Sequence, residues 1–148
     1  NMEKEFRRLL NQSAVPVAGA EEILQYLYKK NYCLCAASNG PYDQQINRLK
    51  KADMLKYFAH CFVSEKLGAD KPGKQFFDGC MRELPGITPE ECMIIGDSLT
   101  ADITGGRAYG MSTCWYVPSV EKYREVKTKS GKPADYVVHE LAELEKIL

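Results

Sequence analysis

The segment CMIIGDSLTADITGG, residues 92–106, places two carboxylates where they could hold a metal ion beside a phosphate. Apolar residues lead up to Gly96, Asp97 follows directly, and Asp102 comes five positions later. Mg²⁺ is usually held by one or two carboxylates together with waters and phosphate oxygens. The pattern therefore predicts Asp97 and Asp102 as magnesium ligands. The structural alternative makes Asp102 a partner of a helix dipole and Asp97 a turn residue.

A second polar group, Ser38-Asn39-Gly40, follows the apolar stretch 32–37. A hydroxyl, an amide and a glycine that permits unusual backbone angles can together surround a phosphate with hydrogen-bond donors. The alternative is a simple turn, because Asn-Gly followed by Pro is typical turn sequence.

Lys71 is the third candidate, and it lies in the loop sequence GADKPG. Pro72 biases Lys71 towards an extended backbone, and the next helix is predicted to begin immediately afterwards. An ammonium held there could neutralise the charge of a phosphoryl group during its transfer. The alternative is an ordinary loop lysine surrounded by water.

The elements that must position these groups alternate between strands and helices. Apolar runs predict strands at residues 32–37, 60–65, 92–96, 112–117 and 135–139. Helical spacing of apolar residues predicts helices over 2–11, 20–31, 43–56, 73–84, 101–109 and 140–148, with another helix start at 88–91. The polar segment 120–134 is assigned no element. This alternation predicts an α/β protein with a three-layer, doubly wound and mostly parallel sheet.

Ligands of such sheets bind just beyond the carboxyl ends of the strands. The three polar groups follow strand ends in order along the chain. We therefore expect the side chains of Ser38, Lys71 and Asp97 to lie within about 10 Å of one another, a span that a hydrated magnesium phosphate can bridge.

In this order the three groups resemble motifs of the haloacid dehalogenase (HAD) superfamily of aspartate-nucleophile phosphatases. SNG resembles its second motif, Lys71-Pro72 its third and GDSLTAD its fourth, and the resemblance runs from about residue 17 to the end. GMSTCWYV and LAELEKIL also fit the subfamily with a helical cap, and the chain is similar to bacterial pyrimidine-nucleotide 5′-phosphatases. Metal-free dehalogenases of the superfamily lack the Gly-Asp…Asp arrangement, so the resemblance favours a phosphatase.

The resemblance implies a role for each candidate residue. Ser38 and Asn39, with Gly40, would bind the phosphoryl group, and Lys71 would neutralise it together with the nucleophile. Asp97 would ligate Mg²⁺, and Asp102 would support the metal or its waters.

The family's first motif, an apolar strand that ends in Asp-x-Asp, has no counterpart in these 148 residues. Its first Asp forms an aspartyl-phosphate, and its second is the general acid and base. Residues 1–12 resemble the end of the cap and 13–148 the core, so we expect the first, central strand to be missing. An upstream segment, a strand from a second copy or direct pairing of strands 32–37 and 92–96 would then fill the gap. We expect the chain alone to be inactive.

Composition limits the classes of partner. Twenty basic residues balance twenty acidic ones, so no overall field favours nucleic acid or an anionic membrane. No apolar run reaches the roughly 20 residues that span a bilayer. The six cysteines form no CxxC pair, which favours buried reduced thiols and a cytoplasmic location over a disulfide framework or a zinc site. Cys33 and Cys35 are predicted to face opposite sides of their strand and so not to pair.

These observations predict a magnesium-dependent phosphomonoester phosphatase for a small phosphorylated metabolite, with a nucleotide as one candidate. The main alternative is a truncated or degenerate module that binds phosphate, metal or a partner protein without catalysis. A phospho-acceptor signalling domain, with Asp97 as the acceptor, would need an acidic pair at another strand end, and the sequence contains none.

Overall fold

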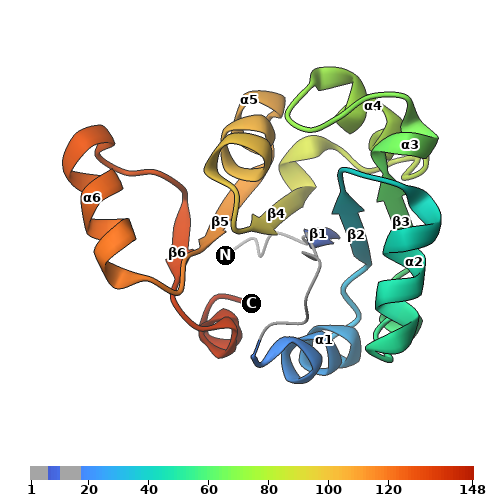
Figure 1. Cartoon of the computed structure of the whole chain (residues 1–148), viewed down its shortest axis with the longest axis horizontal. Coiled ribbons are helices and arrows are strands. Elements are labelled where there is room, and N and C mark those ends of the chain that lie inside the picture. Colours follow the sequence, from blue (N-terminus) through green and yellow to red (C-terminus); the bar gives the residue numbers. More distant parts are fainter. Residues whose placement is uncertain (1–6, 11–17) are drawn as a thin grey trace.

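Within residues 7–10 and 18–148, which the computed structural model describes, six strands form one sheet in the order β3-β2-β1-β4-β5-β6 (Figure 1). All neighbouring strands are parallel. The strands are β1 (Arg7–Leu10), β2 (Leu34–Ser38), β3 (His60–Val63), β4 (Cys92–Gly96), β5 (Ser112–Tyr116) and β6 (Tyr136–Val138). The five predicted strands are confirmed within a few residues at their ends.

Helices cover both faces of this sheet. They are α1 (Ala20–Lys29), α2 (Tyr42–Lys51), α3 (Ser64–Leu67), α4 (Lys74–Arg82), α5 (Gly105–Tyr109) and α6 (Val120–Ser130). Short 3-10 turns are η1 (Leu55–Tyr57), η2 (Pro89–Glu91) and η4 (Leu141–Lys146), and η3 (Leu99–Thr104) is a π-helical turn. Figure 1 shows α1 on one side of the sheet and α4 and α5 on the other. Among the described residues, no helix combines the length and apolar character needed to cross a membrane.

Alternate residues of β2 contribute to two different hydrophobic clusters, one on each face of the sheet. In β2, Leu34 and Ala36 pack in the cluster that contains α1, whereas Cys35 and Ala37 pack in the cluster that contains α4. This alternation is the period of two that a strand imposes on its side chains. Both faces of the strand are apolar because helices cover both, as is usual for parallel sheets. The three-layer α/β fold predicted from the sequence is therefore confirmed.

The central position of the sheet is filled by β1, and here the structure corrects two expectations. The backbone of Arg7–Leu10 pairs with β2 on one side and with β4 on the other. Residues 7–10 are thus a strand of the core and not the end of a cap helix. The sheet has no gap between β2 and β4, because β1 pairs with both. A position between two parallel strands offers partners to the backbone groups of both edges, and this outweighs a local helical pattern. The other residues of 1–17 lie outside the described part of the chain.

The central position between β2 and β4 is filled in a way that the sequence did not suggest. An upstream segment, a second copy and direct pairing of β2 with β4 were the three expected solutions. The structure uses the chain's own residues 7–10, so β2 and β4 each pair with β1 and not with each other.

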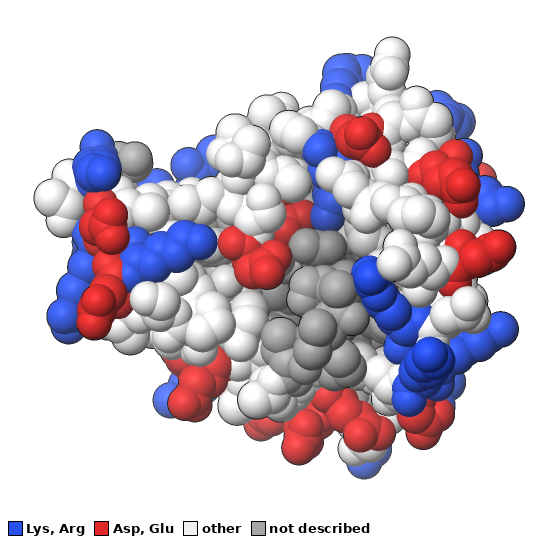
Figure 2. Space-filling view, viewed as in Figure 1, with Lys and Arg blue, Asp and Glu red and all other residues white. Residues whose placement is uncertain are grey.

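Two polar segments also differ from the prediction. Residues 120–134 contain the helix α6, whose side chains are mostly exposed and which is capped by Ser119. Residues 140–148 form only the 3-10 turn η4 instead of a full helix. Figure 2 shows acidic and basic side chains interspersed over one face of the molecule, in keeping with the balanced charge of the sequence.

Cys33 and Cys35 lie on the same side of the sheet, contrary to the prediction. Residues two apart in a strand share a face, and both thiols pack in the cluster under α4 with Cys80 and Cys92. Burial raises the pKa of Cys35, and the neighbouring thiol of Cys33 adds to the shift. Burial likewise raises the pKa of Cys80 to about 12. All six cysteines are free in this structure.

Thiol labelling should follow this burial. Cys33 and Cys61 are half-buried and the other four cysteines are buried, so a water-soluble thiol reagent should modify Cys33 and Cys61 first in the native protein. In denaturant all six should react, as counted by mass spectrometry. Rapid native labelling of Cys80 or Cys92 would contradict this packing.

The contact of α5 with β4 depends on a glycine. A Cβ at Gly106 would collide with Cγ2 of Ile94, and inserting a methyl group into a packed core costs about 1–3 kcal/mol. Gly106→Ala should therefore lower the free energy of unfolding by about this amount in urea titrations. Ile94→Ala removes the opposing methyl group, so the double variant should lose less than the sum of the single losses. Additive losses would show that the two side chains do not meet.

Candidate functional site

Lys71 is buried at the carboxyl edge of the sheet, where it joins β2 to the segment after β4. Its Nζ donates to Oδ1 of Asp102 at 2.6 Å and to the carbonyl oxygen of Ala37 at 2.9 Å. The side chain of Lys71 is 3% exposed and that of Asp102 is 0% exposed. Buried charges persist only when they are paired and hydrogen-bonded. The pair therefore fixes the ammonium in place, and Lys71 is not a solvated loop lysine.

The loop after β2 holds the backbone of Lys71. Oδ1 of Asn39 accepts from the Lys71 N–H at 2.8 Å, and Nδ2 of Asn39 donates to the Lys71 carbonyl at 3.1 Å. The N–H of Gly40 donates to Oγ of Ser64 at 2.7 Å, which ties the loop to the end of β3. Gly40 has a φ of 130°, a conformation that other residues rarely adopt.

Ser38, the last residue of β2, is 5% exposed. Its Oγ has no hydrogen-bond partner within the described part of the chain. A buried hydroxyl without a partner costs about 1–3 kcal/mol. A ligand oxygen beside Ser38 would remove this cost, which is what a phosphate-binding serine requires.

The two carboxylates after β4 have different surroundings. Asp97 is exposed, and its carbonyl oxygen accepts from Nε1 of Trp115 at 3.1 Å. Asp102 is buried, and its Oδ2 accepts from the N–H of Ser98 at 3.2 Å while Oδ1 binds Lys71. A Cβ at Gly96 would collide with the Asp102 carboxylate. Glycine is therefore needed at the end of β4, where this carboxylate packs against the backbone.

The candidate residues thus form one connected group at the carboxyl edge. Asn39, Lys71 and Asp102 are joined by hydrogen bonds, and Ser38 lies between Ala37 and Asn39, which both contact Lys71. Asp97 is connected through its neighbour Ser98, whose N–H binds Asp102. The distance of about 10 Å between the side chains of Ser38, Lys71 and Asp97 stays a prediction.

Several supporting residues were missed in the sequence. Pro72 packs against α5 so closely that a Cβ at Gly105 would lie 2.8 Å from Cβ of Pro72. The adjacent pair Gly105-Gly106 was a usable signal, because glycines inside a helix mark close approach of another element. Trp115 and Ser64 had no local signal, because each acts on a residue that is distant in sequence.

A hydrogen bond between α4 and α5 supports the same region. Oη of Tyr109 donates to Oδ1 of Asp78 at 2.6 Å. This bond, with help from Lys74, lowers the pKa of Asp78. Burial and the Asp78 carboxylate raise the pKa of Tyr109 to about 12. The phenol therefore stays protonated and the carboxylate charged at neutral pH, so the bond persists beside the loop that carries Lys71.

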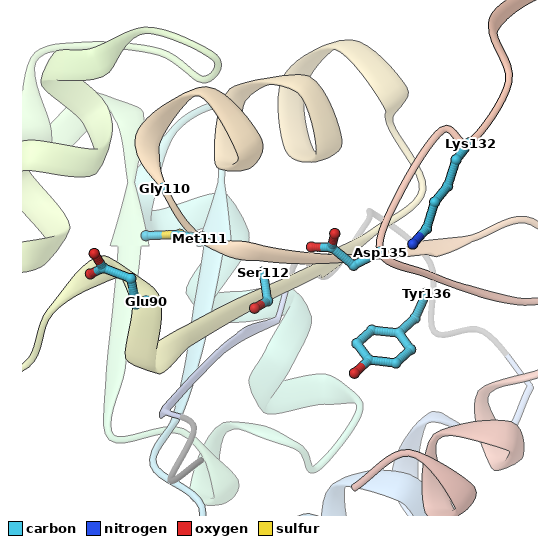
Figure 3. A pocket seen from close by; sticks show the side chains of 7 residues that line it. All are labelled: Glu90, Gly110, Met111, Ser112, Lys132, Asp135 and Tyr136. Carbon is cyan, nitrogen blue, oxygen red and sulfur yellow. The ribbon is translucent and has the colours of Figure 1, made fainter.

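A large hollow of about 690 Å³ lies at the opposite end of the strands from the candidate site (Figure 3). It is lined by Glu90, Gly110, Met111, Ser112, Lys132, Asp135 and Tyr136. These residues lie at or before the amino ends of β4, β5 and β6. Ser38, Lys71 and Asp97 lie instead at or after the carboxyl ends of strands. A smaller hollow of about 420 Å³ borders the candidate site and is lined in part by Gly40, Ser64 and Asp70.

Comparison with known proteins points to one family. A family model described as haloacid dehalogenase-like hydrolase matches residues 1–116. Pyrimidine 5′-nucleotidase PynA of Streptococcus pneumoniae is 38% identical over 109 residues, which are 74% of this chain and 46% of that protein. A glyceraldehyde 3-phosphate phosphatase of Pyrococcus furiosus is 30% identical over 132 residues, 89% of this chain and 54% of that protein. The chain spans about half the length of these curated relatives.

A solved structure agrees with the sequence matches. The putative HAD-hydrolase YfnB from Bacillus subtilis, bound to magnesium, superposes with a TM-score of 0.79 and is 34% identical in sequence. The match covers 89% of this chain and 55% of that one.

The buried ion pair should dominate the stability of this edge. Asp102→Asn leaves the Lys71 ammonium without its counter-charge, so the free energy of unfolding should fall by about 3–5 kcal/mol in urea titrations. The matched control is Lys56→Ala, which breaks a pair whose side chains are 54% and 77% exposed and should leave the midpoint nearly unchanged. Equal effects of the two variants would mean that the Lys71–Asp102 pair is not buried.

Proposed function

The chain belongs to the haloacid dehalogenase-like hydrolase family, and on this basis we propose that it carries the site of a magnesium-dependent phosphatase for a small phosphorylated metabolite. One observation carries the proposal. A buried ammonium, that of Lys71, is held at the strand edge where the buried hydroxyl of Ser38 has no partner in the described residues. An anion with several oxygens, such as a phosphate, satisfies both groups at once.

The residues would divide the work as follows. Ser38 would donate its hydroxyl to a phosphate oxygen, and the Lys71 ammonium would neutralise charge as the phosphoryl group moves. Gly40 would keep the loop open beside the phosphate, since it has no side chain. A group that is fixed before reaction needs no reorganisation during it, and this is the usual source of electrostatic catalysis.

The carboxylates fit a magnesium ion in unequal roles. Within the described residues no group of three or more His, Cys, Asp or Glu side chains could hold a metal ion. One or two carboxylates with waters and phosphate oxygens are nevertheless a normal set for Mg²⁺, which would neutralise phosphate oxygens when bound. Asp97 is exposed and available as a ligand, whereas both oxygens of Asp102 already accept hydrogen bonds. We assign Asp97 as the direct ligand and Asp102 as the support of Lys71.

The nucleophile is the missing part. These residues contain no Asp-x-Asp, and we propose that the complete enzyme supplies it from residues outside them. The relatives are named for different substrates, a pyrimidine nucleotide and glyceraldehyde 3-phosphate, so the proposal extends to a small phosphomonoester, with a nucleotide as one candidate. Free thiols at all six cysteines favour a cytoplasmic location.

A second candidate function is a binding module without catalysis, and the absent Asp-x-Asp favours it. It would use the same contacts to Ser38, Lys71 and Asp97. The two functions differ in turnover by the complete protein and not in ligand binding by this chain.

Trp115 provides a measurement of ligand binding. It is the single tryptophan of the sequence, and its Nε1 binds the Asp97 carbonyl. Titration with MgCl₂ should change its fluorescence in a saturable way, and Asp97→Asn should abolish this response. Asp43→Asn on the exposed side of α2 is the matched control and should respond like the parent chain.

Ser38→Ala should weaken binding of inorganic phosphate roughly tenfold or more, since a hydrogen bond to a charged group contributes about 1.5–3 kcal/mol.

The same chain should release no phosphate from p-nitrophenyl phosphate, with or without MgCl₂. Absence of any binding of Mg²⁺ or phosphate would refute the proposed site. Magnesium-dependent hydrolysis by the chain that Asp97→Asn abolishes would show that the nucleophile has been misassigned.

A further inference from the structure

We propose that Asn39 is a positioning residue that sets the place of the Lys71 ammonium, and that it acts on a bound phosphate through Lys71. This inference rests on the proposed function, and it changes the role that the family resemblance implied for Asn39. The geometry of the site carries it.

The side-chain amide of Asn39 pairs with both backbone groups of one residue. Oδ1 accepts from the Lys71 N–H at 2.8 Å, and Nδ2 donates to the Lys71 carbonyl at 3.1 Å. This is the exchange that two residues make in a hydrogen-bonded pair of an antiparallel sheet, with a side-chain amide in place of one peptide group. A single hydrogen bond would leave the Lys71 backbone free to pivot, whereas two bonds in opposite senses fix its orientation.

The tip of Lys71 contacts the same strand end as its backbone. Nζ binds the carbonyl of Ala37 at 2.9 Å, and Ala37 and Asn39 flank Ser38 in the chain. Lys71 therefore bridges across Ser38, whose hydroxyl has no partner in the described residues. Three consecutive residues thus determine where the ammonium lies relative to that hydroxyl.

The residue that follows Lys71 is also closely packed. Pro72 packs against α5, so closely that a Cβ at Gly105 would lie 2.8 Å from its Cβ. The loop is therefore held at two consecutive residues, Lys71 by Asn39 and Pro72 by its packing on α5. The side-chain amide keeps one N–H and one lone pair unused by Lys71, so a direct contact with phosphate is the competing explanation.

Amide hydrogen exchange tests the geometric half of the proposal. In Asn39→Ala the Lys71 N–H loses its acceptor, and its exchange should become roughly ten- to hundredfold faster. Asn47→Ala, on the exposed surface of α2, is the matched control and should leave the exchange of Lys71 unchanged. Unchanged exchange of the Lys71 N–H in Asn39→Ala would overturn the proposal, and the measurement requires no ligand.

A double-mutant cycle tests whether Asn39 acts through Lys71. In the parent chain, Asn39→Ala should weaken binding of inorganic phosphate by roughly tenfold. In a background of Lys71→Met with Asp102→Asn, which leaves no buried unpaired charge, the same change should alter affinity less than about twofold. An equal loss in both backgrounds would mean that Asn39 contacts the phosphate itself and would overturn the proposal. If the parent chain binds no phosphate, the proposed function fails, while hydrogen exchange still decides the role of Asn39.

Discussion

Lys71 and Asp102 carry opposite charges in a place that water does not reach, and neither could remain there alone. The ammonium also binds the carbonyl of Ala37, so the pair connects β2 to the segment that follows β4. Removing an unpaired charge from water costs several kcal/mol, so the two segments must come together for either charge to be tolerated. Glycine at position 96, which leaves room for the carboxylate, and Pro72 packed on α5 both serve this one contact.

The ion pair also spans the central strand of the sheet. β1 lies between β2 and β4, and Lys71 connects the ends of those two strands beyond it. The family resemblance implies a central strand that ends in Asp-x-Asp, and β1, with the sequence Arg-Arg-Leu-Leu, does not carry that motif. Under the proposed function, a nucleophile from residues outside this sequence would have to reach the same end of the sheet, because these residues contain no Asp-x-Asp.

Much of the sheet could be predicted from the sequence, because β2 and β4 are mostly apolar and buried along their whole length. β1 could not, since Arg-Arg-Leu-Leu has no strand pattern and its pairing is decided by the two strands beside it. α6 was missed for a related reason: its residues are polar on nearly every side, so they show no apolar period.

The site shows the same limit. Its residues could be found because each follows a strand and is a type that binds phosphate or metal. Their pairing could not, since the contacts of Asn39 and Asp102 with Lys71 join segments about thirty residues apart. Local spacing contains no information about which acceptor a buried lysine will meet.

The parallel order of the sheet has a consequence for how the chain reaches this structure. A tight hairpin cannot connect any neighbouring pair in the described sheet, because two parallel strands need a longer crossover between them. The pairing of Arg7 with Cys92 is the extreme case, since most of the chain must be present before β1 finds its second neighbour. Folds dominated by such distant pairings form slowly, and their strand edges stay unpaired during that time. The strands that build the site are therefore also the ones most exposed to wrong partners before the molecule is complete.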